Sequence, residues 1–455
     1  MDLLHGPIFR SMVMFAIPIF VSSIFQQLYN TMDTVIVGHT LGERSLAAMG
    51  ACTSIYDLLV GFALGIGNGL SIVTARSFGS GDHRLLKRSV ASSLVIGASI
   101  TLFIVLLTRV ILWRLLVMLN TPPEILEEAY SYISTITLFV GVMFAYNLCA
   151  GLLRAIGNSL MPLVFLIISS CLNIVLDLLF IRKFGMGVRG AAIATVIAQG
   201  VSALLCLFYI IRKVKLLIPS AEDFRPKKSL YQELLGQGIA MGLMSCLVSA
   251  GSVVLQSGIN SLGYLTIAGH AAARKLFQFS MMPIVAMAQT VNTFVAQNRG
   301  ADQGGRIRKG IRCAYRYNAC VALLMTVLAV FAAPSLMHLV SGSDDPLVIA
   351  NGAAYIRVAA PFYVILGMIN DTRFALQAIG QKLRPLISSV TELIGKMVFA
   401  ALLIPRFGYT AVIFCEPVIW CFMAAELVYS FYTNPYIKEC RGEDWKLSKH
   451  FWKKK

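Results

Sequence analysis

The chain has 455 residues, of which 57% are hydrophobic and only 13% are charged. Soluble globular proteins average about 45–50% apolar and about 25% charged residues, so this composition excludes a set of soluble domains and predicts a polytopic membrane protein. The spans should be helices, because barrel strands alternate over short segments. The net charge of +17 is interpreted as a positive-inside bias, since the basic residues lie in loops, and we expect no nucleic-acid partner.

Twelve apolar runs are each long enough to cross a bilayer, which takes about 20 helical residues. We expect the spans at 11–37, 50–76, 90–113, 130–153, 161–181, 190–211, 234–262, 267–297, 313–333, 351–378, 385–405 and 410–432. Loops that follow even-numbered spans carry most of the Lys and Arg. Both termini should therefore be cytoplasmic in a multi-pass protein of the cell membrane.

Several motifs that would indicate other functions are missing or misplaced. The ten cysteines are scattered without a CxxC pair, so neither a disulfide framework nor a zinc site is expected. The glycines of the sequence GIGNG at 65–69 lie inside a span, and we interpret them as positions of close helix packing rather than as a nucleotide loop. No Walker motif and no nucleophile–base spacing is present, so we expect neither an ATP-driven pump nor an enzyme.

The sequence repeats itself at an offset of 223 residues. The segments LRAIGNSLMPL (153–163) and LQAIGQKLRPL (376–386) match at seven of eleven positions without a gap. We therefore predict an all-α membrane protein with twelve transmembrane helices in two pseudo-twofold-related six-helix bundles. The predicted parts are an N-terminal lobe at 1–215, a cytoplasmic linker at 216–232, a C-terminal lobe at 233–437 and a basic cytoplasmic tail at 438–455. This layout is typical of a transporter that alternates access between its lobes, and we expect a monomer.

Ionisable residues inside the spans of the first half are the strongest functional signal. Asp33, Asp57 and Asp177 have no Lys or Arg inside the spans of that half, and each charged carboxylate at the bilayer centre costs about 2.5–3.5 kcal/mol. Asp57 lies near the predicted start of its span, and we interpret it as a side chain that reaches the outer interface. The two remaining carboxylates predict a cation site in the first half.

The neighbours of these carboxylates support a site for H⁺ or Na⁺. Asn173 and Asp177 are four residues apart and share one helix face. Thr195 lies in a run of small, apolar residues. Carboxylates together with amide and hydroxyl oxygens suit a hard cation, and two adjacent carboxylates also favour retention of one proton. We predict cation binding at Asp33, Asn173, Asp177 and Thr195, with Na⁺ as the metal candidate and no further cofactor.

The second half carries acids and bases that can neutralise each other. Lys396 follows Glu392 at i+4, the spacing of a helical ion pair. We interpret these charges as structural pairs, although Arg274 and Lys275 also suit an anionic group. The predicted secondary cluster comprises Arg274, Lys275, Asp371, Arg373, Glu392 and Lys396.

The order of several motifs resembles one transporter family. They are AIPIFVSSIFQQLYNTMDTVIVGHTLG in the first span, ARSFGSGD after the second span, and then LRAIGNSLMP, LNIVLDLLFI and RGAAIATVIAQG. This pattern resembles the multidrug and toxic compound extrusion (MATE) family, on its DinF-like and MepA-like branch, with the fold of the MOP superfamily. The resemblance covers about residues 8–435. It implies a secondary antiporter that exports amphipathic, often cationic drugs or toxic compounds in exchange for H⁺ or Na⁺.

The resemblance also implies roles for individual residues. Cation coupling falls on Asp33, Asn173, Asp177 and Thr195, helix bending on Pro18, and the substrate chamber on Tyr29 and Asn30. The alternative is a flippase of the same superfamily that moves a lipid-linked oligosaccharide. Twelve spans and an acidic first half weigh against this alternative, because a pyrophosphate headgroup favours a cationic cavity.

Overall fold

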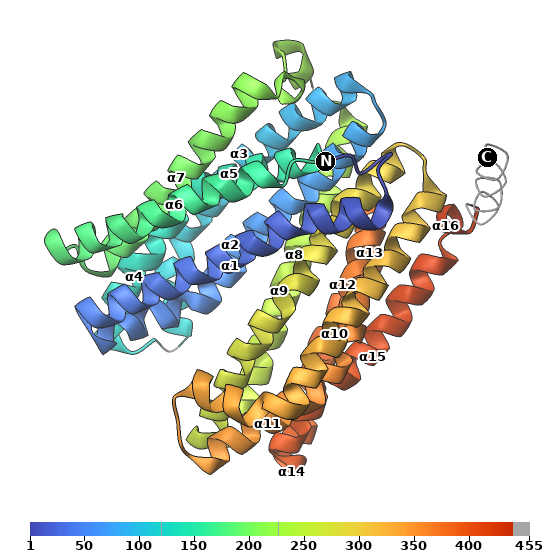
Figure 1. The fold of residues 1–455 in the computed structure, drawn as a ribbon. Coiled ribbons are helices and arrows are strands. Elements are labelled where there is room, and N and C mark those ends of the chain that lie inside the picture. Colours follow the sequence, from blue (N-terminus) through green and yellow to red (C-terminus); the bar gives the residue numbers. More distant parts are fainter. Residues whose placement is uncertain (120, 226, 440–455) are drawn as a thin grey trace. The chain divides into compact units, whose positions relative to one another are not determined.

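The computed structural model describes residues 1–119, 121–225 and 227–439, and every regular element within these ranges is helical (Figure 1). The elements up to residue 224 are α1 (Ile8–Leu41), α2 (Glu43–Gly79), α3 (His83–Met118), α4 (Pro123–Leu138), α5 (Val140–Ala155), α6 (Leu160–Asp177), η1 (Leu178–Lys183), α7 (Gly187–Lys213), η2 (Lys215–Leu217) and η3 (Ala221–Phe224). The elements after it are α8 (Lys228–Asn260), α9 (Tyr264–Gly300), α10 (Gly304–Ser341), α11 (Pro346–Ala359), η4 (Ala360–Phe362), α12 (Tyr363–Ala378), α13 (Leu383–Val398), η5 (Phe399–Leu403), α14 (Ile404–Phe407), α15 (Tyr409–Thr433) and α16 (Pro435–Glu439). The predicted all-α class is confirmed.

The helices account for all twelve predicted spans. Eleven spans in the described ranges are long and apolar enough to cross a membrane on their own. The predicted span at 130–153 corresponds to α4 and α5, which together pass the same test but meet at a bend of 47°. Apolar helices suit the bilayer because their backbone groups are satisfied internally. The chain is therefore a multi-pass membrane protein.

The bounds of the elements repeat with the same offset as the sequence. Helix α5 (140–155) and helix α12 (363–378) have equal lengths and begin 223 residues apart, as do the starts of α6 and α13. A π-helical segment follows α6 as η1 and follows α13 as η5. The two halves therefore share their local irregularities as well as their sequence pattern.

The described chain divides into two compact units. One unit holds Met1 and Ile17–Cys246, and the other holds Asp2–Ala16 and the chain from Leu247 onward. Both crossings at Ala16 and Cys246 lie inside long helices, α1 and α8. This division groups residues by spatial contact, whereas the predicted boundaries at 215 and 233 mark the repeat. Residues 440–455 of the predicted tail lie outside the described residues.

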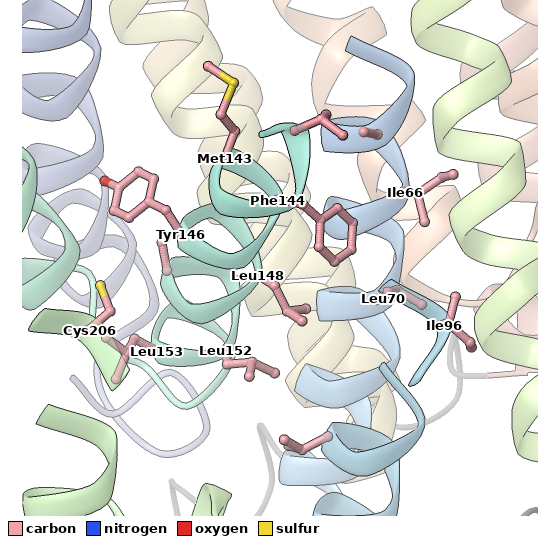
Figure 2. Close-up of a cluster of buried hydrophobic side chains, with 14 of the residues drawn as sticks. Ile66, Leu70, Ile96, Met143, Phe144, Tyr146, Leu148, Leu152, Leu153 and Cys206 are labelled. Carbon is pink, nitrogen blue, oxygen red and sulfur yellow. The ribbon is translucent and has the colours of Figure 1, made fainter. Parts of the chain in front are cut away.

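The core of the first unit forms where α2, α3 and α5 pack together, and α7 contacts α4, α5 and α6. Phe144 of α5 lies among Ile66, Leu70 and Ile96 in this core (Figure 2). A β-carbon at Gly97 would collide with the Phe144 ring. The core therefore requires a small residue on α3 at this position.

The predicted close packing at the glycines of α2 is confirmed. A β-carbon at Gly65 would lie 2.8 Å from the Cα of Gly242, and one at Gly69 would lie 2.6 Å from the carbonyl oxygen of Gln237. Both contacts are with the backbone of the first half of α8. Glycine lets the two helices approach until their backbones touch, which is how membrane helices gain packing energy.

Candidate functional site

A cavity of about 710 Å³ lies within the first unit. Its wall is built from α1, α2, α4, α5 and α7. The lining residues are Gln26, Tyr29, Asn30, Asp33, Thr34, Leu46, Met49, Gly50, Cys52, Thr53, Tyr56, Asp57, Leu64, Tyr132, Ile136, Met143, Thr195 and Gln199. None of these is Lys, Arg or His, and two are carboxylates. The volume lies within the range of about 300–1,000 Å³ that is usual for small-molecule sites.

The cavity brings four of the predicted site residues together. Tyr29, Asn30 and Asp33 reach it from α1, and Thr195 reaches it from α7. These helices are distant in the sequence, so their meeting depends on the packing of the unit. Asp33 is only 6% exposed and Thr195 is likewise 6% exposed. The predicted chamber residues and two of the predicted coupling residues therefore share one wall.

Asp33 and Asp177 form a carboxylate pair at this wall. The side chain of Asp33 interacts with those of Asp177 and Thr195. Asp177 ends α6 directly before the π-helical segment η1, and it is completely buried. In a medium of low dielectric constant, two adjacent carboxylates repel each other strongly. A proton or a monovalent cation at the pair relieves this repulsion.

Buried oxygen atoms around the pair lack hydrogen-bond partners among the described residues. They include Oδ1 of Asp33, both carboxyl oxygens of Asp177, Oδ1 of Asn173 and Oγ1 of Thr195. Buried polar atoms normally have hydrogen-bond partners. A group of unpaired oxygen atoms at one place therefore points to a ligand that is bound there. Oxygen donors of the carboxyl, amide and hydroxyl types are what a hard cation prefers. The predicted residues therefore offer a donor set that suits Na⁺, and equally a carboxyl site that suits H⁺.

The structure adds a second feature of Asp57, whose position relative to the membrane surface stays a prediction. Helix α2 begins at Glu43, so Asp57 lies 14 residues into the helix, about 21 Å along its axis. Its side chain is exposed and lines the cavity. The helix starts seven residues before the predicted span, because an apolar run alone does not show where a helix begins. Tyr56, Tyr132 and Gln199 were also missed, since their types are common on any helix.

The second unit contains a ladder of charges that satisfy each other, all of them buried except the half-buried Arg274. Glu416 accepts hydrogen bonds from Arg274 at 2.9 Å and 3.0 Å and from the hydroxyl of Tyr355 at 2.6 Å. The Lys396 ammonium lies 2.9 Å from Glu392 and 3.8 Å from Glu416. Glu392 also lies 3.7 Å from Arg373. The charge ladder thus alternates three cations with two carboxylates, in the order Arg274, Glu416, Lys396, Glu392 and Arg373.

Two residues of the predicted secondary cluster lie outside this ladder. Lys275 is exposed and makes no ion pair or hydrogen bond with a described residue, because it lies on another face of α9 from Arg274. Asp371 is completely buried and accepts a hydrogen bond from Asn318 at 2.7 Å. Glu416 was absent from the predicted cluster although it joins the others. Its role depends on α15 packing against α13, which the sequence does not reveal.

The repeat relates the ladder to the acidic cavity. At the offset of 223, Tyr355 corresponds to Tyr132 of the cavity wall, and Lys396 corresponds to Asn173. The second unit therefore places an ammonium group where the first unit places a neutral amide. Carboxylates near Lys396 are neutralised from within the protein, whereas those near Asn173 are not.

The sequence matches the model of one protein family twice. The family model, described as MatE, matches residues 18–179 and again residues 240–402, which together exceed half of the chain. The chain belongs to the MatE family. The two matches fall on the two copies of the repeat, so this MatE protein carries the family's unit in duplicate. The family resemblance that the order of the motifs indicated is confirmed.

Curated relatives of this MatE protein extend over nearly its whole length. It is 26% identical over 386 residues to the "Probable multidrug resistance protein YpnP" of Bacillus subtilis, covering 85% of this chain and 86% of the relative. It is 24% identical over 433 residues to the "Multidrug export protein MepA" of Staphylococcus saprophyticus, covering 92% and 91%. The alignments therefore leave no large domain of either protein unmatched.

Solved structures share the fold of this MatE protein. A crystal structure titled as MATE in the bent conformation has a TM-score of 0.89 at 22% identity, covering 96% of this chain and 98% of that one. An outward-facing MATE transporter of the MOP superfamily has a TM-score of 0.87 at 23% identity, covering 94% and 96%. The predicted MATE fold is therefore confirmed.

Proposed function

We propose that this protein is a secondary antiporter that exports amphipathic cationic compounds in exchange for H⁺ or Na⁺. The relatives named as multidrug export and multidrug resistance proteins support drug export. The observation that carries the proposal is the cavity of the first unit, which is large enough for a drug-sized molecule and is lined by carboxylates without any basic side chain. Such a cavity attracts cations and repels anions.

Coupling follows from the position of the carboxylate pair beside the cavity. When Asp33 and Asp177 are both charged, their negative potential attracts an organic cation into the cavity. A proton or Na⁺ bound at the pair cancels much of that potential, so the affinity for the organic cation falls. Binding of the two cations is therefore mutually unfavourable, as thermodynamic linkage requires of an exchanger. Asn173 and Thr195 contribute oxygen atoms to the site of the coupling ion.

The charge ladder of the second unit has no comparable need for an external cation. Lys396 supplies a positive charge to Glu392 and Glu416, and Arg274 and Arg373 supply two more. A protein that binds its own ammonium group at this position gains nothing from a solvent cation there. We therefore place the coupling ion in the first unit and not at the ladder. Asp371, a buried carboxylate outside the ladder, is the position in the second unit to test against it.

Alternating access between the lobes involves helix α1 and its proline. Pro18 is buried inside α1, two residues after the point at which that helix passes from one compact unit to the other. Proline lacks the N–H group that would bond to the preceding turn, so a helix bends easily there. A change of charge at Asp33 on the same helix can therefore be expressed as a bend at Pro18. The positive-inside bias supports a cytoplasmic location of both termini, and we propose that the chain acts as a monomer.

The alternative function, a flippase for a lipid-linked oligosaccharide, fits the cavity less well. A pyrophosphate headgroup would need Lys or Arg, and the cavity lining contains neither. The acidic lining therefore favours the antiporter.

Gradient-driven efflux from proteoliposomes tests the proposal. A fluorescent cationic dye is loaded inside, and its release is driven in turn by a pH gradient and by a Na⁺ gradient, with wild type, Asp33→Asn and Asp177→Asn compared. We expect one gradient to drive efflux and either substitution to reduce it about a hundredfold or more, because transport then lacks its coupling charge. Glu43→Gln, which removes an acid from the exposed first turn of α2, is the matched control and should leave efflux unchanged.

The outcomes separate the alternatives. Efflux that is equally fast in wild type and in both aspartate variants would place the coupling ion elsewhere, with Asp371 and Glu392 tested next. A wild type that moves no cationic dye under either gradient would overturn the antiporter proposal and favour the flippase.

A further inference from the structure

Asp57 is a carboxylate of the cavity to which the coupling site assigns no role. It lies on α2, whereas Asp33 lies on α1 and Asp177 on α6. The side chain of Asp57 is exposed and lines the cavity. Asp33 is 6% exposed and Asp177 is not exposed at all. The cavity therefore presents one accessible carboxylate and one that is almost enclosed.

The surroundings of the two carboxylates differ in the ligand that they suit. The Asp33 carboxyl interacts with the side chains of Asp177 and Thr195, and the unpaired oxygen atoms of these three residues suit a small hard ion. Asp57 makes no ion pair and no hydrogen bond with a described residue, and the cavity lining offers it no Lys, Arg or His. A carboxylate that no cation of the protein neutralises attracts positive charge. For Asp57 that charge comes from the contents of the cavity.

Apolar and aromatic side chains share the cavity with Asp57. Tyr56 and Tyr132 contribute ring surface, and Met49 and Met143 contribute flexible thioethers. Aromatic rings attract cations through their faces, and methionine adapts to ligands of different shapes. An apolar wall with one accessible negative charge is complementary to an amphipathic cation, in which an aromatic body carries a single positive charge.

We propose that Asp57 is the residue that pairs with the positive charge of the exported substrate, while the Asp33–Asp177 pair is reserved for the coupling ion. This assignment rests on the proposed antiport function, which it refines by separating the two cation sites. Two carboxylate sites in one cavity allow the ion and the substrate to influence each other through the shared potential without competing for the same oxygen atoms. The substrate class is a monovalent, amphipathic organic cation.

A pair of probes that differ only in charge tests this assignment. Methyltriphenylphosphonium is a cation, and triphenylphosphine oxide is a neutral molecule of nearly the same shape. Binding of both is measured with purified wild type, Asp57→Asn, Asp57→Glu and the control Glu43→Gln in lipid nanodiscs, and transport of the cation is measured in proteoliposomes. We expect Asp57→Asn to weaken binding of the cation about tenfold or more, because one opposite charge is lost in a partly desolvated site. Binding of the neutral probe should change by less than about twofold on the same reasoning.

The conservative variant separates charge from structure. Asp57→Glu keeps the negative charge, so it should restore most of the affinity for the cation. The assignment of Asp57 would be overturned if Asp57→Asn weakened binding of both probes equally, or if it left the affinity for the cation unchanged. Gradient-driven transport by wild type would still support the antiporter in either case. Charge-selective binding that depends on Asp57, without transport under either gradient, would support the assignment and overturn the antiport function instead.

Discussion

The charge ladder of the second unit predicts which of its members is hardest to replace. Glu416 is bonded to Arg274 and Tyr355 and lies 3.8 Å from Lys396. The ladder holds three cations and two carboxylates, so its net charge is +1. Replacing Glu416 by glutamine raises this charge to +2 and leaves Arg274 without an anionic partner. We expect Glu416→Gln to destabilise the protein by about 3–5 kcal/mol, the usual cost of breaking a buried ion pair from one side.

Replacing the lysine of the ladder should destabilise the protein less than replacing Glu416, although Lys396 is equally buried. Lys396→Met lowers the net charge from +1 to 0, and each carboxylate keeps an arginine partner, with Arg274 on Glu416 and Arg373 on Glu392. The loss is then about one charged hydrogen bond, or about 1.5–3 kcal/mol, and methionine fills much of the lysine's volume. The net charge of the ladder, and not the burial of the two side chains, therefore predicts which variant is less stable.

Thermal denaturation in detergent, followed by tryptophan fluorescence at one scan rate, measures the difference. Each kcal/mol corresponds to about 2–4 °C for a unit of about 200 residues, so Glu416→Gln should unfold at a clearly lower temperature than Lys396→Met. Because unfolding of a large protein is often irreversible, the scan rate has to be held constant. If Lys396→Met unfolds first, the charge count is not what governs the stability of the ladder, and the lysine's own contacts dominate.

Two further predictions concern helix packing and the segment between the two repeats. Gly69→Ala should lower the unfolding temperature by an amount equivalent to about 1–3 kcal/mol, because its β-carbon would meet the backbone of Gln237; Gly61→Ala on the same helix meets nothing within 4 Å and serves as control, and equal effects would contradict the reasoning. The pKa of Asp223 is lowered because the backbone N–H and the hydroxyl of Ser220 donate to its carboxylate. A lowered folded-state pKa stabilises the segment above its unfolded value of about 3.9 and ceases to do so as the pH falls through the folded value. Amide exchange of residues 221–224, corrected for intrinsic rates, should therefore accelerate below about pH 4 in wild type, and a pH-independent protection in wild type would refute this.

The spans and the repeat could be predicted because both depend on local sequence. A bilayer accepts only helices of a minimum apolar length, so each apolar run predicts one span wherever the others lie. The offset of 223 between the two copies is likewise visible without coordinates, and it reappears in the bounds of α5 and α12. Asp33 and Asp177 stood out because a carboxylate inside a span is costly in any fold.

The partners of those carboxylates depended on tertiary structure. Asp33 and Asp177 are 144 residues apart, and helical periodicity shows which face each lies on but not which helices meet at that face. The same limit explains why the cavity position of Asp57 and the exposure of Lys275 were not predicted, because whether a side chain reaches a cavity or the membrane depends on the helices packed beside it. The apolar pattern thus determined by itself that this chain crosses a membrane many times, and the sequence repeat determined that it does so in two copies. Only the packing of the helices decided which buried charges are neutralised within the protein and which remain for a ligand, because ion pairs act over a few ångströms between residues far apart in the sequence.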